Sequence, residues 1–247
     1  MVHNESVFLP IWLGYYSRFF APQDIYVLDN DSTDGSTEER GFTRIRAEHD
    51  RVDHAWMVRR VESLQRELLE RYDLVLVSDV DELIAPNPSR GTLGDYLDSF
   101  SEDYVNCLGY ELLHIRDAER PFAGDRPILS QRGYWFPNGA YDKPAIASQP
   151  ISYREGFHSR TDGQFNWDPD LRLVHLHRMD YAICIERHRV RSRRRWADDD
   201  LSWSLARHNR IVEEAEFERW FYSESGFENH GIGIELETVP ASWGAVF

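Results

Sequence analysis

Residues 72–88 read Tyr-Asp-Leu-Val-Leu-Val-Ser-Asp-Val-Asp-Glu-Leu-Ile-Ala-Pro-Asn-Pro, an apolar run that ends in a group of carboxylates. The apolar run Leu74–Val77 predicts a strand that is buried on both faces of a parallel sheet. Asp79, Asp81 and Glu82 follow directly, so we expect three carboxylates at the carboxyl end of a central strand, where open α/β sheets bind ligands. Crowded carboxylates repel one another unless a cation lies between them, which predicts a Mg²⁺ or Mn²⁺ site. The alternative is a strand that ends in a solvated acidic turn.

The composition is that of a globular protein with an acidic surface. The chain has 247 residues, of which 41% are hydrophobic, and its formal net charge is −15. Such a charge argues against nonspecific nucleic-acid binding, which depends on Lys and Arg neutralising phosphates. An anionic substrate would therefore need a cation or a local basic patch.

Cysteine content and hydropathy give expectations about the compartment. The chain has two cysteines, Cys107 and Cys184, which are too few for a disulfide framework or a structural zinc site and which we expect to be buried thiols. No apolar run is long enough to span a membrane, and no secretory leader opens the chain. We expect a cytoplasmic protein, with a peripheral position at the inner face of the membrane as a further possibility.

The first part of the chain alternates helical and strand patterns. Apolar residues recur at helical spacing from Phe8 to Phe19, and a second stripe of Val58, Val61, Leu64 and Leu68 follows Ala55. Ile25–Leu28 and Leu74–Val77 are strand-like, and 43–47 is a further candidate strand. This βαβ order predicts an α/β fold with a mostly parallel, Rossmann-like central sheet flanked by helices.

The second part of the chain has a different pattern. The segments 104–115, 128–136, 143–146 and 171–174 are strand-like, and helices are expected from Tyr181 and from Asp198. The three carboxylates Asp198, Asp199 and Asp200 suit the positive end of the second helix. These helices predict a C-terminal helical extension of the sheet domain.

Two acidic motifs follow successive predicted strands, Asp29-Asn30-Asp31-Ser32-Thr33-Asp34-Gly35-Ser36 and Asp79-Val80-Asp81-Glu82, and His3-Asn4-Glu5 precedes both. Over about residues 1–90 this arrangement resembles a family 2-type glycosyltransferase of the GT-A fold. Lys143-Pro144 and His175-Leu176-His177 resemble a bacterial branch of that group. The resemblance implies an inverting, metal-dependent transfer of a sugar from a nucleotide-sugar donor, most commonly a UDP-sugar, to a glycan or lipid-linked acceptor.

The resemblance also implies a division of the chain. Residues 1–100 would be the nucleotide-sugar-binding half of a GT-A domain, 101–180 the acceptor-side half, and 181–247 the helical extension. The implied nucleotide-sugar contacts are His3, Asn4, Glu5, Asp29, Asn30, Asp79 and Lys143. The implied ligands of Mn²⁺ or Mg²⁺ are Asp79, Asp81, His175 and His177. Asn30 stands where the family usually has a second Asp, which puts the base contacts at that position in doubt.

Glycosyl transfer also needs a general base for the acceptor hydroxyl, usually a carboxylate. The candidates in the second half are Glu111, Asp142, Asp162 and Asp168. Asp162 ranks first because it lies in a Gly-containing loop between two His-bearing segments.

Other interpretations of the same residues stay open. Asp29–Ser36 is also typical of a turn with a helix cap. His175 and His177 point to one face of a strand and also suit a domain seam, and Lys143 also suits a surface lysine. At the level of function, the alternatives are a metal-dependent phosphoester hydrolase, since carboxylates and His build two-metal sites, and a nucleotide-binding module without turnover.

Overall fold

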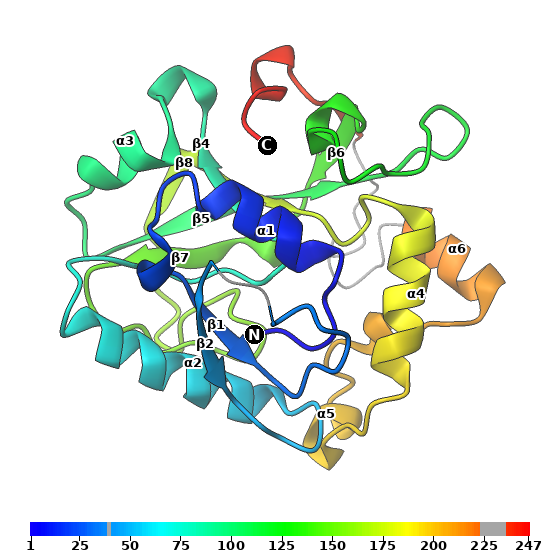
Figure 1. Cartoon of the computed structure of the whole chain (residues 1–247), viewed down its shortest axis with the longest axis horizontal. Coiled ribbons are helices and arrows are strands. Elements are labelled where there is room, and N and C mark those ends of the chain that lie inside the picture. Colours follow the sequence, from blue (N-terminus) through cyan, green and yellow to red (C-terminus); the bar gives the residue numbers. More distant parts are fainter. Residues whose placement is uncertain (39–40, 223–235) are drawn as a thin grey trace.

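A computed structural model gives the structure of the chain and describes residues 1–38, 41–222 and 236–247 (Figure 1). The α-helices are α1 (Phe8–Tyr16), α2 (His54–Leu69), α3 (Leu93–Asp98), α4 (Tyr181–Ser192), α5 (Asp198–Ser202) and α6 (Glu214–Tyr222). The strands are β1 (Tyr26–Asp29), β2 (Thr43–Arg46), β3 (Val75–Leu76), β4 (Glu82–Pro86), β5 (Tyr104–Leu112), β6 (Tyr134–Pro137), β7 (Lys143–Ala147), β8 (Trp167–His175) and β9 (Glu237–Thr238). Short 3₁₀ helices are η1 (Pro22–Asp24), η2 (Pro88–Arg90), η3 (Ile128–Ser130), η4 (Gly139–Tyr141), η5 (Arg207–Arg210) and η6 (Ala241–Trp243).

Most strands belong to one large sheet in which antiparallel pairs predominate. Along the order β3-β7-β5-β6-β9, every neighbouring pair is antiparallel. β8 pairs in parallel with β5 and antiparallel with β4. β1 and β2 form a separate parallel pair, to which Val2 adds a bridge with Asp29.

The prediction of a mostly parallel, Rossmann-like central sheet flanked by helices is therefore wrong. The Leu74–Val77 run does become a strand, but only Val75 and Leu76 pair in it, and their partner is β7 in an antiparallel register. The longest strands are β5 and β8, from the part of the chain where the helix–strand alternation had ended. The last described segment also returns to the sheet, because β9 pairs with β6. An apolar run indicates a strand that is buried on both faces, which is typical of parallel sheets but does not fix the direction of the neighbouring strand.

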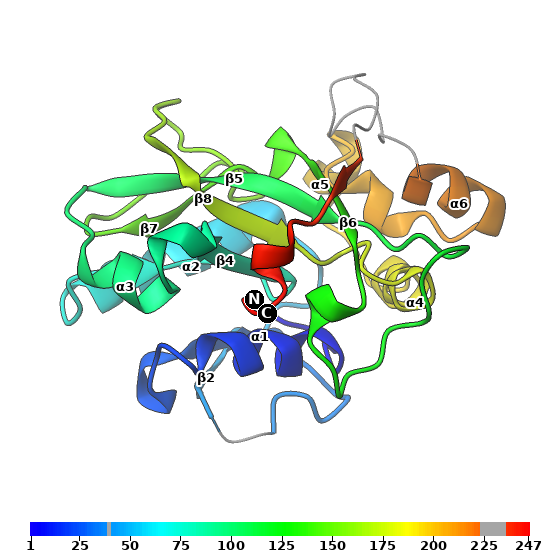
Figure 2. The ribbon, with the colours of Figure 1, turned by 90° about the horizontal axis from the view of Figure 1, so that it is seen from above.

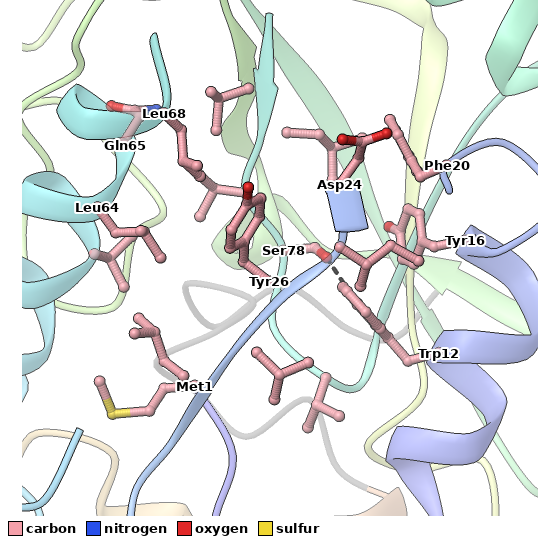
Figure 3. Close-up of a pocket in the computed structure, with 18 of the residues that line it drawn as sticks. Met1, Trp12, Tyr16, Phe20, Asp24, Tyr26, Leu64, Gln65, Leu68 and Ser78 are labelled. Atoms are coloured by element: carbon pink, nitrogen blue, oxygen red, sulfur yellow. Dashed lines mark hydrogen bonds between the residues drawn. The ribbon is translucent and has the colours of Figure 1, made fainter. Parts of the chain in front are cut away.

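A mainly apolar cavity of about 180 Å³ lies where a continuous parallel sheet would have joined β1 to β3. Figure 3 shows it between α1 and α2, with Trp12 on one side and Leu64 and Leu68 on the other. The Trp12 indole donates to the Ser78 hydroxyl at 2.9 Å within this lining. The cavity separates the small parallel sheet from the large one.

Helix α1 holds the start of β4 in place. Tyr15 donates its hydroxyl to the Ile84 carbonyl at 2.7 Å, and the Tyr16 hydroxyl accepts from the Ile84 amide at 3.0 Å. Tyr16 also donates to the Glu82 carbonyl at 3.2 Å. The hydrogen bonds from Tyr15 and Tyr16 fix the acidic segment at the start of β4.

Figure 2 shows α1 on one side of the large sheet and α4 and α6 at one end of it.

Helix α4 begins at a well-defined cap. One oxygen of Asp180 accepts the amides of Ala182 and Ile183 at 3.0 and 3.1 Å, which satisfies two of the free N–H groups of the first turn. Its other oxygen accepts from Arg132, which lies between η3 and β6, so the cap also holds α4 against that segment. The cap sets the rotation of α4 and therefore where its basic residues point.

Every helix in the described ranges is too short or too polar to cross a lipid bilayer.

Candidate functional site

The segment that precedes β4 meets the end of β8 at a buried ion cluster. β4 and β8 pair with Glu82 opposite His175, and the Asp81 carbonyl accepts the Leu176 amide at 2.8 Å. This register brings Asp81 Oδ2 to 3.4 Å from His175 Nε2, although the two residues are far apart in sequence. Arg187 of α4 donates Nη1 to the same carboxylate oxygen. All three side chains are buried.

Glu111 of β5 lies behind His175 and orients it. The two residues are opposite each other in the parallel β5–β8 register, and His175 Nδ1 is 3.0 and 3.1 Å from the two Glu111 oxygens. Burial alone would lower the pKa of His175, but the charges of Glu111 and Asp81 raise it to about 10. The ring is therefore an imidazolium held between two carboxylates. Nδ1 faces Glu111, and Nε2 faces Asp81.

Arg187 joins Asp81 to the N-terminal segment. Its Nε and Nη2 donate to Glu5 Oε1 at 3.0 and 2.8 Å, and Arg191, one turn later, reaches the same oxygen at 3.3 Å. Burial would raise the pKa of Asp81, but the charges of Arg187 and His175 hold it well below its usual range. Asp81 is thus an ionised carboxylate with two cationic neighbours.

Lys143 is fully buried and connects the two remaining carboxylates of the acidic segment. Its Nζ lies 2.9 Å from Asp79 Oδ2 and 2.5 Å from Glu82 Oε2. Burial would lower the pKa of Lys143, but the charges of Asp79 and Glu82 raise it. Of the predicted metal ligands Asp79 and Asp81, the first therefore binds Lys143 and the second belongs to the histidine cluster.

The N-terminal segment and the loop after β1 are joined by hydrogen bonds. Asn4, at a positive φ of 56°, accepts the Thr33 and Asp34 amides at 2.7 and 3.2 Å. His3 donates Nδ1 to the Asn30 carbonyl at 2.6 Å. Arg194 donates to the Asn30 side chain at 2.6 Å, so the basic helix end reaches this loop as well.

Asp29 is engaged inside the protein. Its carboxylate accepts the Ser32 amide at 3.0 Å, the Thr37 hydroxyl at 3.0 Å and the Arg44 guanidinium. Burial would raise its pKa, but these hydrogen bonds lower it. Asp29 therefore fixes the loop, and the bonds leave little capacity for a ligand.

His177 lies between two groups of potential metal ligands. Ligand atoms of Asp81, His175 and His177 all lie within 4.8 Å of one another, and so do those of His177, Cys184 and His188. All of these residues are buried. Burial lowers the pKa of His177, which keeps its ring neutral and able to ligate a cation.

The predicted general bases lie in three different environments. Asp162 is 42% exposed and pairs with Arg160 at 2.6 Å, and hydrogen bonds, chiefly from Arg160, lower its pKa to about 2. Asp168 accepts the Tyr96 hydroxyl at 2.8 Å, and Glu111 is the buried partner of His175. Asp142 is partly buried, and burial raises its pKa to about 6 in spite of a hydrogen bond from the Gly109 amide.

The position of Asp142 also favours it over Asp162. Its chain neighbours are Tyr141, whose ring stacks on His175 with centroids 3.9 Å apart, and Lys143, which binds Asp79. Asp142 therefore borders the cluster, whereas Asp162 lies in an exposed ion pair.

Sequence reasoning missed the basic residues of α4. The pattern predicts a helix from Tyr181, but it does not single out the buried Arg187. A signal was present: Arg187, Arg191 and Arg194 recur at spacings of four and three, which places them on one helix face. Cys184 and His188, also four apart, share another face.

Comparisons of this chain with protein-family models, with curated proteins and with solved structures found no match.

Proposed function

We propose that this protein is a glycosyltransferase that uses a divalent cation to bind a nucleotide-sugar and transfers the sugar to an acceptor hydroxyl. The observation that supports it is the convergence of Asp81, from the acidic segment, with His175 and His177, from the second half of the chain. The sequence resemblance singled out these segments independently of any geometry. The proposal rests on this site and on the motifs, and it makes no use of a parallel sheet.

The cluster offers one carboxylate and two imidazoles to a divalent cation. The Asp81 carboxylate supplies the oxygen ligand that Mn²⁺ prefers. His175 would become a ligand by giving up its Nε2 proton, with His177 as a third donor, and the cation would then replace the His175 imidazolium as a counter-charge of Asp81 beside Arg187. Glu111 fixes the orientation of His175, as carboxylates behind metal-bound histidines do. When bound, the cation would neutralise the charge that develops on the diphosphate leaving group.

The arginines of α4 and its end supply the positive charge that an anionic donor needs in this acidic chain. Arg187, Arg191 and Arg194 extend from Asp81 past Glu5 to Asn30. A guanidinium binds phosphate oxygens through paired N–H groups, which suits a diphosphate. His3 and Asn4 shape the loop beside this row.

Asp142 is the carboxylate we assign as the general base. A pKa of about 6 places it near the operating pH, where a base is both ionised and still basic enough to accept a proton. Asp162, with a pKa of about 2, is a poor acceptor. Glu111 has no exposed surface and acts by positioning His175.

The test is a panel of nucleotide-sugars, with Mn²⁺ or with EDTA, in which release of the nucleoside diphosphate is measured. We expect release with one nucleotide class, dependent on the cation. Asp81→Asn should lower the rate at least a hundredfold, because it removes the anionic ligand. Asp170→Asn is the matched control, since Asp170 is in a partly exposed pair with Arg90, and its rate should be that of the wild type.

Two outcomes would refute the transferase, and a third would refute the site assigned to it. Hydrolysis of simple phosphoesters without any need for a sugar donor would identify a phosphoester hydrolase. Tight nucleotide binding without turnover under any condition would identify a binding module. Unchanged activity in Asp81→Asn would remove the cluster from the reaction.

A further inference from the structure

Three buried side chains next to the Asp81 cluster direct soft metal ligands at one another. Cys184 and His188 are four residues apart in α4, so both lie on one face of the helix, and His177 comes from the turn after β8. His177 Nε2 lies 2.8 Å from His188 Nε2, and Cys184 Sγ lies 3.9 Å from that same nitrogen. None of these three residues is more than 3% exposed.

The hydrogen bond on the far side of His188 fixes which nitrogen is free to ligate. His188 Nδ1 donates to the Ile211 carbonyl at 3.0 Å. A neutral imidazole that donates through Nδ1 carries its lone pair on Nε2, and that atom points at His177 and Cys184. Metal-bound histidines have this same arrangement, with the second nitrogen held by a carbonyl.

We propose that Cys184 Sγ, His188 Nε2 and His177 Nε2 form a Zn²⁺ site that clips α4 to the end of β8. One thiolate and two imidazoles suit zinc, whereas Mg²⁺ prefers oxygen ligands. On binding, the thiol releases one proton to solvent, and His177 keeps its single proton by carrying it on Nδ1. Three protein ligands leave the fourth tetrahedral position for a water molecule.

The site adjoins the cluster proposed to bind a nucleotide-sugar and shares His177 with it, but it differs in chemistry because it adds a thiolate. Arg187, next to His188 in α4, points to Asp81 and Glu5, so the same helix serves both clusters from different faces. His177 belongs to both groups of potential ligands, so zinc bound here leaves Asp81 and His175 as the protein ligands of the other cation. The number of cysteines in the sequence does not reveal this site, because the site uses one thiolate and two imidazoles.

The surrounding side chains determine how the experiment must be done. The rings of Phe217 and Trp220 of α6 lie within 5.0 and 4.8 Å of the His188 ring and cover it. The whole chain is therefore refolded in oxygen-free buffer with one equivalent of Co²⁺, a spectroscopic substitute for zinc. Cobalt bound by a thiolate gives a charge-transfer absorption in the near ultraviolet and, when tetrahedral, strong visible bands.

We expect one Co²⁺ per chain, displaced by Zn²⁺, with the thiolate absorption present in the wild type. Cys184→Ser should lose that absorption and bind cobalt at least tenfold more weakly. Cys107→Ser is the matched control, because it makes the same change at the other buried thiol, and it should retain the absorption. Asp81→Asn should retain it too, which separates this site from the transferase proposal.

Absence of the thiolate absorption in refolded wild-type protein would overturn the proposal and leave a plain hydrogen bond between two buried histidines. Its persistence in Cys184→Ser would overturn it as well. If Cys184→Ser does not fold, X-ray absorption of the zinc-loaded wild type decides: one sulfur and two imidazole nitrogens around the metal support the site, and a shell without sulfur refutes it.

Discussion

Arg187 of α4 donates a hydrogen bond to Asp81, a residue 106 positions earlier in the chain, and both side chains are buried. The same guanidinium binds Glu5, so it neutralises two carboxylates from the N-terminal part of the molecule. Burying an unpaired carboxylate costs several kcal/mol, and the pairing with Arg187 offsets much of that cost for Asp81 and Glu5.

Arg187→Gln should destabilise the protein by about 3 kcal/mol, because it leaves Asp81 and Glu5 without their main counter-charge. The free energy of unfolding is measured by chemical denaturation in EDTA and again with Mn²⁺. We expect Mn²⁺ to restore more stability in the variant than it adds to the wild type, since the cation takes over the role of the guanidinium.

The control for this experiment lies on the same helix. Arg189→Gln removes an arginine whose pair with Glu186 is exposed, so its unfolding free energy should change by less than about 0.5 kcal/mol. Two results would contradict the role assigned to Arg187: an equal loss of unfolding free energy in both variants, or an Arg187→Gln variant whose stability does not change when Mn²⁺ is added.

Lys143→Met should cost about 3 kcal/mol, because the buried Glu82 carboxylate loses the cation that is in direct contact with it. Burial raises the pKa of Glu82 even with Lys143 in place, and loss of the lysine should raise it further. The double variant Lys143→Met with Glu82→Gln should recover much of the loss. Additive losses in this double-mutant cycle would show that the two charges are independent.

The local patterns in the sequence predicted individual elements better than their assembly. The stripe Val58, Val61, Leu64 and Leu68 lies on the buried face of α2, and α4 begins at Tyr181 as expected. The strand at 25–28 is present as β1, shifted by one residue. What failed was the pairing, because hydrophobic runs at 74–77 and 171–174 specify burial, whereas strand direction depends on contacts between distant segments.

In the candidate site, too, individual residues could be predicted from the sequence, but their contacts could not. The sequence named Asp81, His175 and His177, and the fold brings their ligand atoms together. It also named Lys143, but could not tell a surface lysine from a side chain with no exposed surface. Arg187, Cys184 and His188 were missed because a helical register assigns residues to faces, and only the packing of α4 decides which face meets Asp81.

Gly109→Ala should destabilise the protein by about 2 kcal/mol or more, since a Cβ in this central strand would lie 2.5 Å from the Asn138 carbonyl oxygen and 2.7 Å from Tyr141 Cβ. The backbone there has to shift, and with it the segment that carries Asp142 and Lys143. Gly124→Ala makes the same chemical change where no atom lies within 4 Å, and its denaturation midpoint should stay near that of the wild type. Similar midpoints for both variants would show that β5 and residues 138–141 are not in close contact.

Asp142→Asn should make the protein more stable at neutral pH and less active. Burial raises the pKa of Asp142 from 3.8 to about 6 in the folded state, so folding favours the protonated form. The stability contributed by this group is therefore fully present below about pH 4 and is lost as the pH rises through 6. Asparagine does not titrate, so the variant should gain relative to the wild type over that interval and reach a constant advantage of about 1 kcal/mol, because partial exposure screens the full effect.

The measurement is a series of denaturation curves for the two proteins from pH 4 to 8, together with transfer rates at the same pH values. Comparing the proteins at each pH cancels the titration of every other group. A stability difference that does not change with pH would show that the carboxylate is not desolvated. A more stable variant that keeps the full rate of transfer would confirm the buried carboxylate but would assign the role of base to another residue.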